Sequence, residues 1–203
     1  MTGIDRLVLA SNNPGKLREI RALLAPLAID VVTQAELGIA EADEPHATFL
    51  ENALAKARHA SAAAGMPALA DDSGLCVAAL GGEPGVQSAY YAGRSGSRAQ
   101  RDARNNAKLI AALSGVADRR AHYYCMVVLV RRADDPQPVF CEGLWRGEIA
   151  AAPRGEGGFG YDPLFYLPEQ GRSAAELESG EKNRLSHRGR ALAGLLDRLR
   201  EPA

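Results

Sequence analysis

The chain has 203 residues, of which 46% are hydrophobic and 24% are charged, so it can bury a substantial core and has the composition of a soluble globular protein. Its formal net charge of −1 at pH 7 provides no overall positive field that would favour DNA or an anionic membrane. No apolar run reaches the length of a membrane span, and the N-terminus lacks the basic and apolar regions of a signal peptide, so we expect a cytoplasmic protein.

The first predicted elements are a strand over residues 6–10, a polar loop over residues 11–16 and a helix whose apolar residues recur through residues 17–27. A glycine-containing loop before a helix brings backbone N–H groups to a helix N-terminus, which is an arrangement that binds phosphate. Lys16 would lie in the first helical turn, where it opposes the helix dipole, so an anionic partner explains it better than a structural role. The loop lacks the Walker pattern, and a plain strand-to-helix turn is the alternative.

A second strand is predicted over residues 29–32, and a capping-box pattern at Thr48 predicts the start of the next helix. Glu44 lies just before this cap, where the helix can hold its carboxylate rigidly. With Asp72 it could complete a magnesium site. Lys56 lies within the helix, and nothing in the sequence distinguishes it from an ordinary exposed charge that makes weak ion pairs.

Two adjacent carboxylates, Asp71 and Asp72, interrupt an apolar run at residues 68–77. A buried ionised carboxylate must be paired, hydrogen-bonded or bound to a metal. Because a proline and a glycine bracket the run, we predict a short buried strand at residues 68–71 and an exit turn at residues 72–74. Successive strand side chains point to opposite faces, so the two carboxylates are expected to have different roles, unless both only serve the turn.

The next segments predict a glycine-rich surface loop at residues 81–93, a helix at residues 102–113 and paired antiparallel strands at residues 121–131 and 138–145. Trp145 is expected to lie in the core or at an interface. No internal repeat or linker divides the chain, so the whole chain is predicted to be one domain with two lobes. The three cysteines lie far apart, without metal-site or redox spacing, and are expected to be buried free thiols in a reducing compartment.

Two polar clusters follow in the last third of the chain. Glycines surround aromatic residues at residues 155–165, which allows close approach to a flat ligand and offers stacking surfaces. Asp162 within this cluster could be only a turn residue. A basic run at residues 182–190 precedes a final leucine-rich helix. Basic runs are usually solvated, but this one contains serine, histidine and arginine donors suited to an anionic or carbonyl-bearing ligand.

Five motifs, in this order, together resemble the inosine/xanthosine triphosphate pyrophosphatase family over essentially the whole chain. They are Ser11-Asn12-Asn13-Pro14-Gly15-Lys16, Phe49-Leu50-Glu51-Asn52-Ala53, Asp71-Asp72-Ser73-Gly74-Leu75, Gly158-Phe159-Gly160-Tyr161-Asp162-Pro163 and Ser186-His187-Arg188-Gly189. The first residue of the phosphate loop is Ser11, where threonine is also common in the family, and the hydroxyl is preserved.

The resemblance implies an elongated, two-lobed α/β fold with a long central mixed β-sheet flanked by helices and a nucleotide cleft between the lobes. It implies a homodimer with Mg²⁺ as cofactor and a purine nucleoside triphosphate as substrate, and we expect no nucleic-acid or membrane partner. Deaminated purine triphosphates (ITP, dITP and XTP) would be cleaved between the α and β phosphates to the monophosphate and pyrophosphate.

The resemblance also assigns site residues. Glu44 and Asp72 match the metal-linked carboxylates, and Asp72 also matches the proposed base. The substrate-binding positions are Ser11, Asn12, Asn13, Pro14, Gly15, Lys16, Ser73, Phe159, Gly160, Tyr161, Asp162, Lys182, His187 and Arg188.

These assignments are chemically coherent. A triphosphate carries about four negative charges, so bringing it near Asp72 requires Mg²⁺ and the ammonium groups of Lys16 and Lys182. Water held by Asp72 could then attack in line. Arg188 can only donate hydrogen bonds, so we expect it to favour a purine 6-carbonyl over the amino group of adenine. Two alternatives remain: a Maf-like nucleotide pyrophosphatase that acts on other modified bases, and a non-catalytic nucleotide- or RNA-binding protein.

Overall fold

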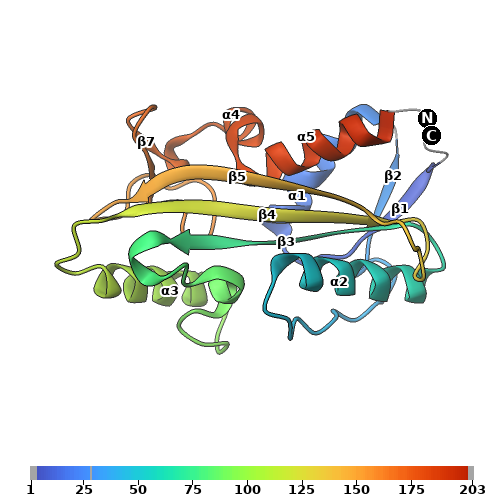
Figure 1. The fold of residues 1–203 in the computed structure, drawn as a ribbon, viewed down its shortest axis with the longest axis horizontal. Helices are drawn as coiled ribbons and strands as arrows, with labels where there is room; N and C mark the ends of the chain where they lie inside the picture. Colours follow the sequence, from blue (N-terminus) through green and yellow to red (C-terminus); the bar gives the residue numbers. More distant parts are fainter. Residues whose placement is uncertain (1–3, 28, 201–203) are drawn as a thin grey trace. The chain divides into compact units, whose positions relative to one another are not determined.

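The computed structural model describes residues 4–27 and 29–200 (Figure 1), so most of the segment inspected for a signal peptide, residues 1–3, lies outside the described residues. The described strands form a mixed seven-stranded sheet in the order β2-β1-β3-β4-β5-β6-β7, with helices packed on its faces, which confirms the predicted α/β class. The strands are β1 (Arg6–Leu9), β2 (Asp30–Thr33), β3 (Ala68–Val77), β4 (Arg120–Val130), β5 (Val139–Ile149), β6 (Phe165–Leu167) and β7 (Arg172–Ser173). The α-helices are α1 (Pro14–Leu24), α2 (Phe49–Ala64), α3 (Arg98–Ala112), α4 (Ser179–Leu185) and α5 (His187–Arg200).

The chain divides into two compact units, which are described separately. Unit 1 contains Met1–Asp72, Cys125–Gly143 and His187–Ala203, and unit 2 contains Ser73–Tyr124 and Leu144–Ser186. Strands β3, β4 and β5 each contribute residues to both units. The single domain and the cleft between two lobes stay predictions.

Unit 1 is built on parallel pairing of β1 with both β2 and β3. In Figure 1, α1 and α5 lie on one face of these strands and α2 lies on the other. Aliphatic side chains from the strands and from α1 and α5 fill the core between them. The fully buried members of this core include Leu7, Leu9, Ile20, Leu24, Leu69, Cys125, Val127, Leu192 and Leu195.

Unit 2 contains the antiparallel strands β5, β6 and β7, and helix α3. Its core is aromatic: the ring centroid of Phe165 lies 4.7 Å from that of Tyr123 and 5.2 Å from that of Trp145. Trp145 is 3% exposed. Of the two placements predicted for this residue, the core is therefore correct.

Several boundaries differ from the sequence prediction: α1 ends at Leu24, β5 runs on to Ile149, and two further differences have a clear physical cause. Helix α3 begins at Arg98, earlier than predicted, because Ser97 and Gln100 form a capping box at its start. The predicted turn at residues 72–74 is wrong, since β3 continues as a strand to Val77. Gly74 serves close packing instead: a Cβ there would lie 2.2 Å from the carbonyl oxygen of Gly85.

The cysteine prediction is confirmed in part. All three cysteines are free, but Cys125 is buried whereas Cys76 and Cys141 are only partly buried. Burial raises the pKa of the Cys125 thiol to about 12, so this thiol is unreactive in the folded chain. Within the described residues, no helix combines the length and apolar character that a bilayer crossing requires.

Candidate active site

The loop between β1 and α1 has the geometry of a capped helix N-terminus. Asn13 is the N-cap of α1, and its Oδ1 accepts hydrogen bonds from the backbone N–H groups of Gly15 (3.0 Å) and Lys16 (3.3 Å). Pro14 occupies the first turn, where it needs no hydrogen-bond partner. Ser11 Oγ accepts from the backbone N–H of Asn13 at 3.3 Å. The loop is therefore held rigid by its own side chains, and Lys16 lies in the first turn, as predicted.

Asn12, the remaining residue of this loop, is exposed and faces β2. Its Oδ1 accepts a hydrogen bond from Nε2 of Gln34, 3.2 Å away, just beyond the end of that strand.

Lys16 belongs to a buried cluster of four charges in unit 1. Its Nζ lies 3.0 Å from Oδ2 of Asp71, and that oxygen also accepts hydrogen bonds from Nε (3.2 Å) and Nη2 (3.1 Å) of Arg188. Nη1 of Arg188 donates a hydrogen bond to the carboxylate of Glu19, which is a residue of α1. Two cations thus balance two carboxylates, and Arg188 is 2% exposed. Glu19 carried no signal in the sequence beyond its place in an amphipathic helix.

Asp72 faces a second group of side chains, which come from α2 and the loop before it. Its Oδ2 accepts a hydrogen bond from Nδ2 of Asn52 at 3.2 Å, and its Oδ1 lies 3.4 Å from Nζ of Lys56. The same ammonium group donates to Glu44. Because the Lys56 side chain is only 13% exposed and lies between two carboxylates, its interpretation as an ordinary surface charge is wrong.

The two aspartates face opposite sides of β3. Asp71 contacts α1 and α5, whereas Asp72 contacts α2, and these helices lie on opposite faces in Figure 1. The alternation of strand side chains produces this separation, which confirms that the two carboxylates have different partners. The alternative in which both only serve a turn is wrong.

Asn52 also fixes the loop that carries Glu44. Its Oδ1 accepts from the backbone N–H of His46 (3.0 Å) and its Nδ2 donates to the carbonyl of the same residue (3.2 Å). Asn52 and Lys56 are four residues apart and share one face of α2. The spacing of these two residues was the available sequence signal, because it places an asparagine and a lysine on one polar face of the helix.

The electrostatics separate the two aspartates further. Although burial alone would raise it, the pKa of Asp71 is held well below its ordinary value by the charges of Lys16 and Arg188. The pKa of Asp72 is raised, because the effect of its burial exceeds that of Lys56. Burial acts to lower the pKa of Lys56, but Asp72 and Glu44 raise it overall, so its ammonium group stays charged. Asp71 is therefore a permanent anion, and Asp72 is the carboxylate better suited to accept a proton.

The carboxylates of Glu44 and Asp72 fit the chemistry of a hard cation. They are oxygen donors that converge on one positive charge, the ammonium group of Lys56. No cluster of three or more histidine, cysteine, aspartate or glutamate side chains suited to a metal occurs in the part of the chain that is described. One or two protein carboxylates, completed by water and substrate phosphates, are the usual ligand set of Mg²⁺.

Unit 2 carries the glycine-aromatic turn at residues 158–162. Oδ2 of Asp162 accepts a hydrogen bond from the backbone N–H of Phe159 (2.8 Å) and forms an ion pair with Nζ of Lys182 (2.7 Å). A Cβ at Gly158 would lie 2.1 Å from that same oxygen, so glycine is required there. Asp162 is thus a turn residue and also the partner of a buried lysine.

The two aromatic side chains of this turn point to different partners. Nζ of Lys182 lies 4.7 Å from the ring centroid of Phe159, within the range of a cation–π contact. Tyr161 is buried, and its hydroxyl donates to the carbonyl of Ser88 at 2.8 Å. Phe159 therefore keeps a partly exposed ring, whereas Tyr161 anchors the turn to the unit core.

The described structure thus gathers most of the predicted site residues into two clusters. Unit 1 brings these residues into two ion networks: Lys16 and Arg188 around Asp71, and Glu44 and Asp72 around Lys56. His187 is buried at the start of α5, and Ser73 follows Asp72 in β3 as a partly buried residue. The unit 2 cluster contains Phe159, Gly160, Tyr161, Asp162 and Lys182.

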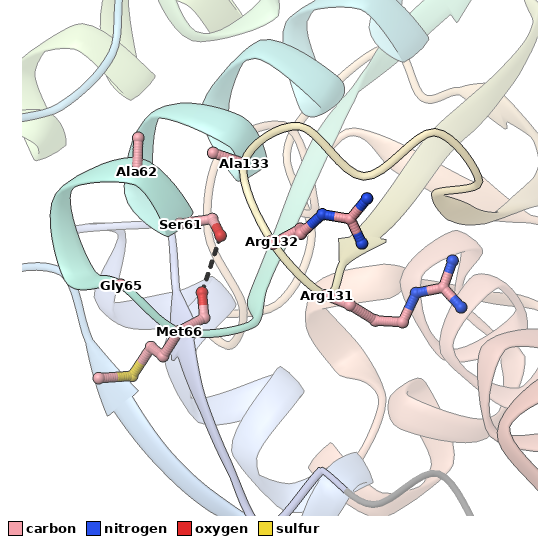
Figure 2. Close-up of a pocket in the computed structure, with 7 residues that line it drawn as sticks. All are labelled: Ser61, Ala62, Gly65, Met66, Arg131, Arg132 and Ala133. Carbon is pink, nitrogen blue, oxygen red and sulfur yellow. Dashed lines mark hydrogen bonds between the residues drawn. The ribbon is translucent and has the colours of Figure 1, made fainter.

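A separate pocket in unit 1, shown in Figure 2, lies between the C-terminal end of α2 and the turn after β4. Its two arginines are already neutralised, Arg131 by Asp135 and Arg132 by Asp134. None of the predicted site residues lines it. Its lining residues are Ser61, Ala62, Gly65, Met66, Arg131, Arg132 and Ala133.

Comparison with known proteins identifies the family. A family model described as the Ham1 family matches residues 7–198. A dITP/XTP pyrophosphatase from Nitrosomonas europaea is 65% identical over 98% of this chain and 96% of the relative, and one from Ralstonia nicotianae is 66% identical over 96% of each. The solved structure of a HAM1 protein from Coxiella burnetii has a TM-score of 0.89 at 47% identity and covers 97% of this chain and 99% of that chain. The Ham1 protein of Staphylococcus aureus has a TM-score of 0.83 at 37% identity and covers 96% and 97%. The chain therefore belongs to the Ham1 family.

Proposed function

We propose that this chain hydrolyses non-canonical purine nucleoside triphosphates (dITP, ITP and XTP) to the nucleoside monophosphate and pyrophosphate. The observation that carries the proposal is the pair of adjacent aspartates in β3, one neutralised by Lys16 and Arg188 and the other poised beside Lys56 with a raised pKa. The names of the two relatives, which share about two thirds of its residues, support the same reaction.

The unit 1 cluster is proposed to bind the triphosphate. Lys16 supplies a positive charge at the N-terminus of α1, beside a loop whose conformation the side chains of Ser11 and Asn13 fix. Asp71 and Glu19 hold Lys16 and Arg188 in place and balance their two positive charges. A preformed positive group at a rigid loop orients a phosphate chain at little entropic cost.

Asp72 is proposed to be the general base. Its carboxylate can hold a water molecule that attacks the α-phosphorus, and it accepts the proton as the oxygen–phosphorus bond forms and pyrophosphate leaves. Asn52 and Lys56 orient the carboxylate from α2, which fixes the direction in which it can hold water. No covalent nucleophile is required in this scheme.

Glu44 and Asp72 are proposed to hold Mg²⁺, the expected cofactor. When bound, the ion would neutralise phosphate charge and polarise the reacting phosphoryl group. Lys56 already marks the position between these two carboxylates as one that favours a positive charge. Its long side chain can move aside when another cation enters.

The unit 2 cluster is proposed to bind the purine base. The ring of Phe159 offers a stacking face, and the ammonium group of Lys182 offers a hydrogen-bond donor beside it. The proposed substrate-binding set also includes Asn12, Asn13, Pro14, Ser73, Tyr161, Asp162, His187 and Arg188.

Discrimination by Arg188 is also a proposal. In the structure its guanidinium group donates to Asp71 and Glu19, so a contact with the purine 6-carbonyl requires one of these donors to be released. Substitution of Arg188 by alanine should narrow the ratio of kcat/KM for ITP over ATP. If the ratio is unchanged in the folded variant, base selection lies elsewhere, and Lys182 is the next donor to substitute.

A panel of triphosphates tests the function directly. The purified chain is incubated with MgCl₂ and with ITP, dITP, XTP, ATP, GTP, dTTP or a methylated-base triphosphate, and pyrophosphate release is measured. Release from ITP, dITP and XTP in large excess over ATP and GTP supports the proposal. Preference for the pyrimidine or methylated substrates would indicate a Maf-like activity, and binding without pyrophosphate release would indicate a non-catalytic nucleotide-binding protein.

We also propose that the chain forms a homodimer in a reducing, cytoplasmic compartment. The three free cysteines support the compartment. Exposed apolar side chains such as Phe140, which is 48% exposed on β5, are candidates for a contact between subunits. Light scattering at micromolar concentration should give twice the chain mass, whereas a monomeric mass would refute the dimer.

A further inference from the structure

Three polar side chains of α3 share one face of the helix and reach the turn that carries Phe159. Arg98, Asp102 and Asn106 follow one another at intervals of four residues, which places them on a single stripe. All three belong to unit 2, as does the turn. We call this set the α3 clamp. None of its members belongs to the motifs that identified the candidate site.

The α3 clamp holds both backbone polar groups of Gly160. Oδ2 of Asp102 accepts a hydrogen bond from the Gly160 N–H at 3.1 Å, and Nδ2 of Asn106 donates to the Gly160 carbonyl at 3.0 Å. Gly160 has a φ of +64°, so this residue allows the chain to reverse directly after Phe159. Because the N–H and the carbonyl of Gly160 both bind one helix, the two peptide groups on either side of Gly160 have a fixed orientation.

The third member of the clamp contacts the ring itself. The guanidinium carbon of Arg98 lies 5.0 Å from the ring centroid of Phe159, and Nε of Arg98 lies 3.6 Å from Oδ2 of Asp102. Asp102 therefore holds the backbone beside Phe159 and also orients the cation that faces its ring. Substituting Asp102 would release both contacts, whereas substituting Asn106 would release only the backbone.

We infer that Asp102 and Asn106 are positioning residues for purine binding, which act by fixing Phe159 as the stacking surface of the base. The inference rests on the proposed function, because it assigns the base to Phe159. Stacking depends on ring separation and offset, so a ring that moves with a loose turn binds a base less well. The clamp should therefore affect substrate affinity, expressed in KM, much more than the chemical step at Asp72.

Kinetics of single variants test this division. Asp102→Ala and Asn106→Ala should each raise KM for ITP by about tenfold, the effect of one lost hydrogen bond to a structured loop, while kcat stays within about twofold. Asp102→Asn should restore most of the affinity, because an amide oxygen still accepts from the Gly160 N–H. Asp118→Ala is the matched control, since Asp118 lies in unit 2 and its carboxylate binds Arg120 at the surface. An unchanged KM in both clamp variants would overturn the inference.

A double-mutant cycle shows whether the clamp acts through Phe159. In a Phe159→Leu background, Asp102→Ala should raise KM no further, because the stacking surface has already been removed. A further tenfold increase in that background would show that Asp102 acts on substrate by another route, and would refute the positioning role.

Hydrogen exchange at the Gly160 amide separates this inference from the proposed function. Exchange should be at least about tenfold faster in Asp102→Ala than in the wild-type chain and unchanged in Asp118→Ala. If the wild-type chain releases no pyrophosphate from ITP, the proposed function fails while this measurement still tests the clamp. If ITP is hydrolysed normally and Gly160 exchange does not change, the clamp fails while the function stands.

Discussion

At the scale of single residues, the main feature of the site is that neighbouring aspartates have opposite environments. Asp71 and Asp72 are both buried, but Asp71 has two cations within hydrogen-bond distance of one oxygen, whereas Asp72 has an amide and a lysine that it shares with Glu44. The pKa of one is lowered and that of the other is raised. One carboxylate is thus kept as a fixed anion and the other is the better suited of the two to accept a proton, without any difference in residue type.

The first prediction concerns Asp72→Asn. The amide keeps the shape of the side chain and its contact with Asn52 but cannot accept a proton or carry the charge that a metal requires. We expect kcat for ITP to fall by at least about 10² to 10⁴, with the circular dichroism spectrum and melting temperature close to those of the wild type. Asp197→Asn, which removes an exposed carboxylate on α5, should leave kcat unchanged. Near-normal turnover in folded Asp72→Asn would remove this residue from the mechanism.

The second prediction concerns Arg188→Ala. Removal of this buried cation leaves Asp71 and Glu19 without one of their partners, and breaking a buried ion pair from one side costs about 3–5 kcal/mol of unfolding free energy. Denaturant unfolding at pH 7 measures this loss. Arg198→Ala, which removes an exposed arginine from the same helix, should change the unfolding free energy by no more than about 0.5 kcal/mol.

The pH dependence of this loss distinguishes its cause. In the wild type, the lowered pKa of Asp71 contributes stability that is complete above its ordinary pKa of 3.8 and is lost as the pH falls through its lower value in the folded state. In Arg188→Ala the pKa of Asp71 must be higher than in the wild type, because Arg188 no longer opposes the effect of burial. As the pH falls, protonation of Asp71 then removes a poorly compensated buried charge and reduces the destabilisation of the variant. The difference in unfolding free energy should therefore shrink between pH 7 and pH 4.5. A constant difference would indicate lost packing instead of an uncompensated charge.

At the scale of elements, β3 passes close to a loop directly after its two aspartates, and a glycine makes this close approach possible. At Gly74, a Cβ would lie 2.2 Å from the Gly85 carbonyl oxygen and 2.5 Å from Oγ of Ser88. Ser88 in turn accepts from the backbone N–H of Leu75 at 2.9 Å, so the approach is also a polar contact. The strand that presents the two aspartates is thus anchored directly after them.

The third prediction is that Gly74→Ala destabilises the chain by about 3 kcal/mol, because a backbone oxygen cannot move aside cheaply. Gly180→Ala is the matched control, since Gly180 is an exposed position of α4 with no atom within 4 Å of the added Cβ. Alanine there should be neutral or stabilising by up to about 1 kcal/mol. Equal unfolding midpoints for the two variants would contradict the packing assigned to Gly74.

Sequence patterns predicted the elements that have strong local signals. The capped helix after Thr48 and the buried strand before Asp72 were found because caps and apolar runs are local features, and helix α1 was found from its apolar period without its cap at Asn13. The short strands β6 and β7 were missed, because two or three residues are too few to show an alternation of apolar and polar side chains. Gly74 was misread as a turn because the loop that it packs against lies eleven or more residues later in the chain, and spacing along the chain does not reveal such a contact.

The residues of the candidate site also divide into those that the sequence indicated and those that only the fold reveals. The family resemblance assigned Lys16, Asp72 and Lys182 as site residues. It assigned no role to Asn52, although Asn52 lies in one of the five motifs, and none to Asp102. Both residues bind backbone groups outside their own helices: the carbonyl and amide of His46 and the amide of Gly160. A polar residue on the buried face of a helix was the available signal, and it identifies no partner without the fold.

At the scale of the whole molecule, the two units share three strands. β3, β4 and β5 each pass from one unit to the other, so neither unit has a complete sheet from one continuous chain segment. Separate domains are usually joined by exposed linkers that few contacts cross. Strands that belong to both units make independent unfolding unfavourable, because each shared strand is one continuous segment and would have to break within its length if only one unit unfolded.

The last prediction is therefore that the chain unfolds in one cooperative transition, and it has a natural probe in each unit. Trp145, the single tryptophan, is buried in the core of unit 2, and the Cys125 thiol is buried in the core of unit 1. In a Cys76→Ser, Cys141→Ser background, urea unfolding followed by tryptophan fluorescence and by pulsed thiol labelling of Cys125 should give the same midpoint, with the wild-type fluorescence midpoint as the control. Labelling of Cys125 at a urea concentration where Trp145 is still native would show that unit 1 unfolds alone. The chain would then consist of two domains, because a unit that loses its core while the other keeps its packing is an independent folding unit in spite of the shared strands.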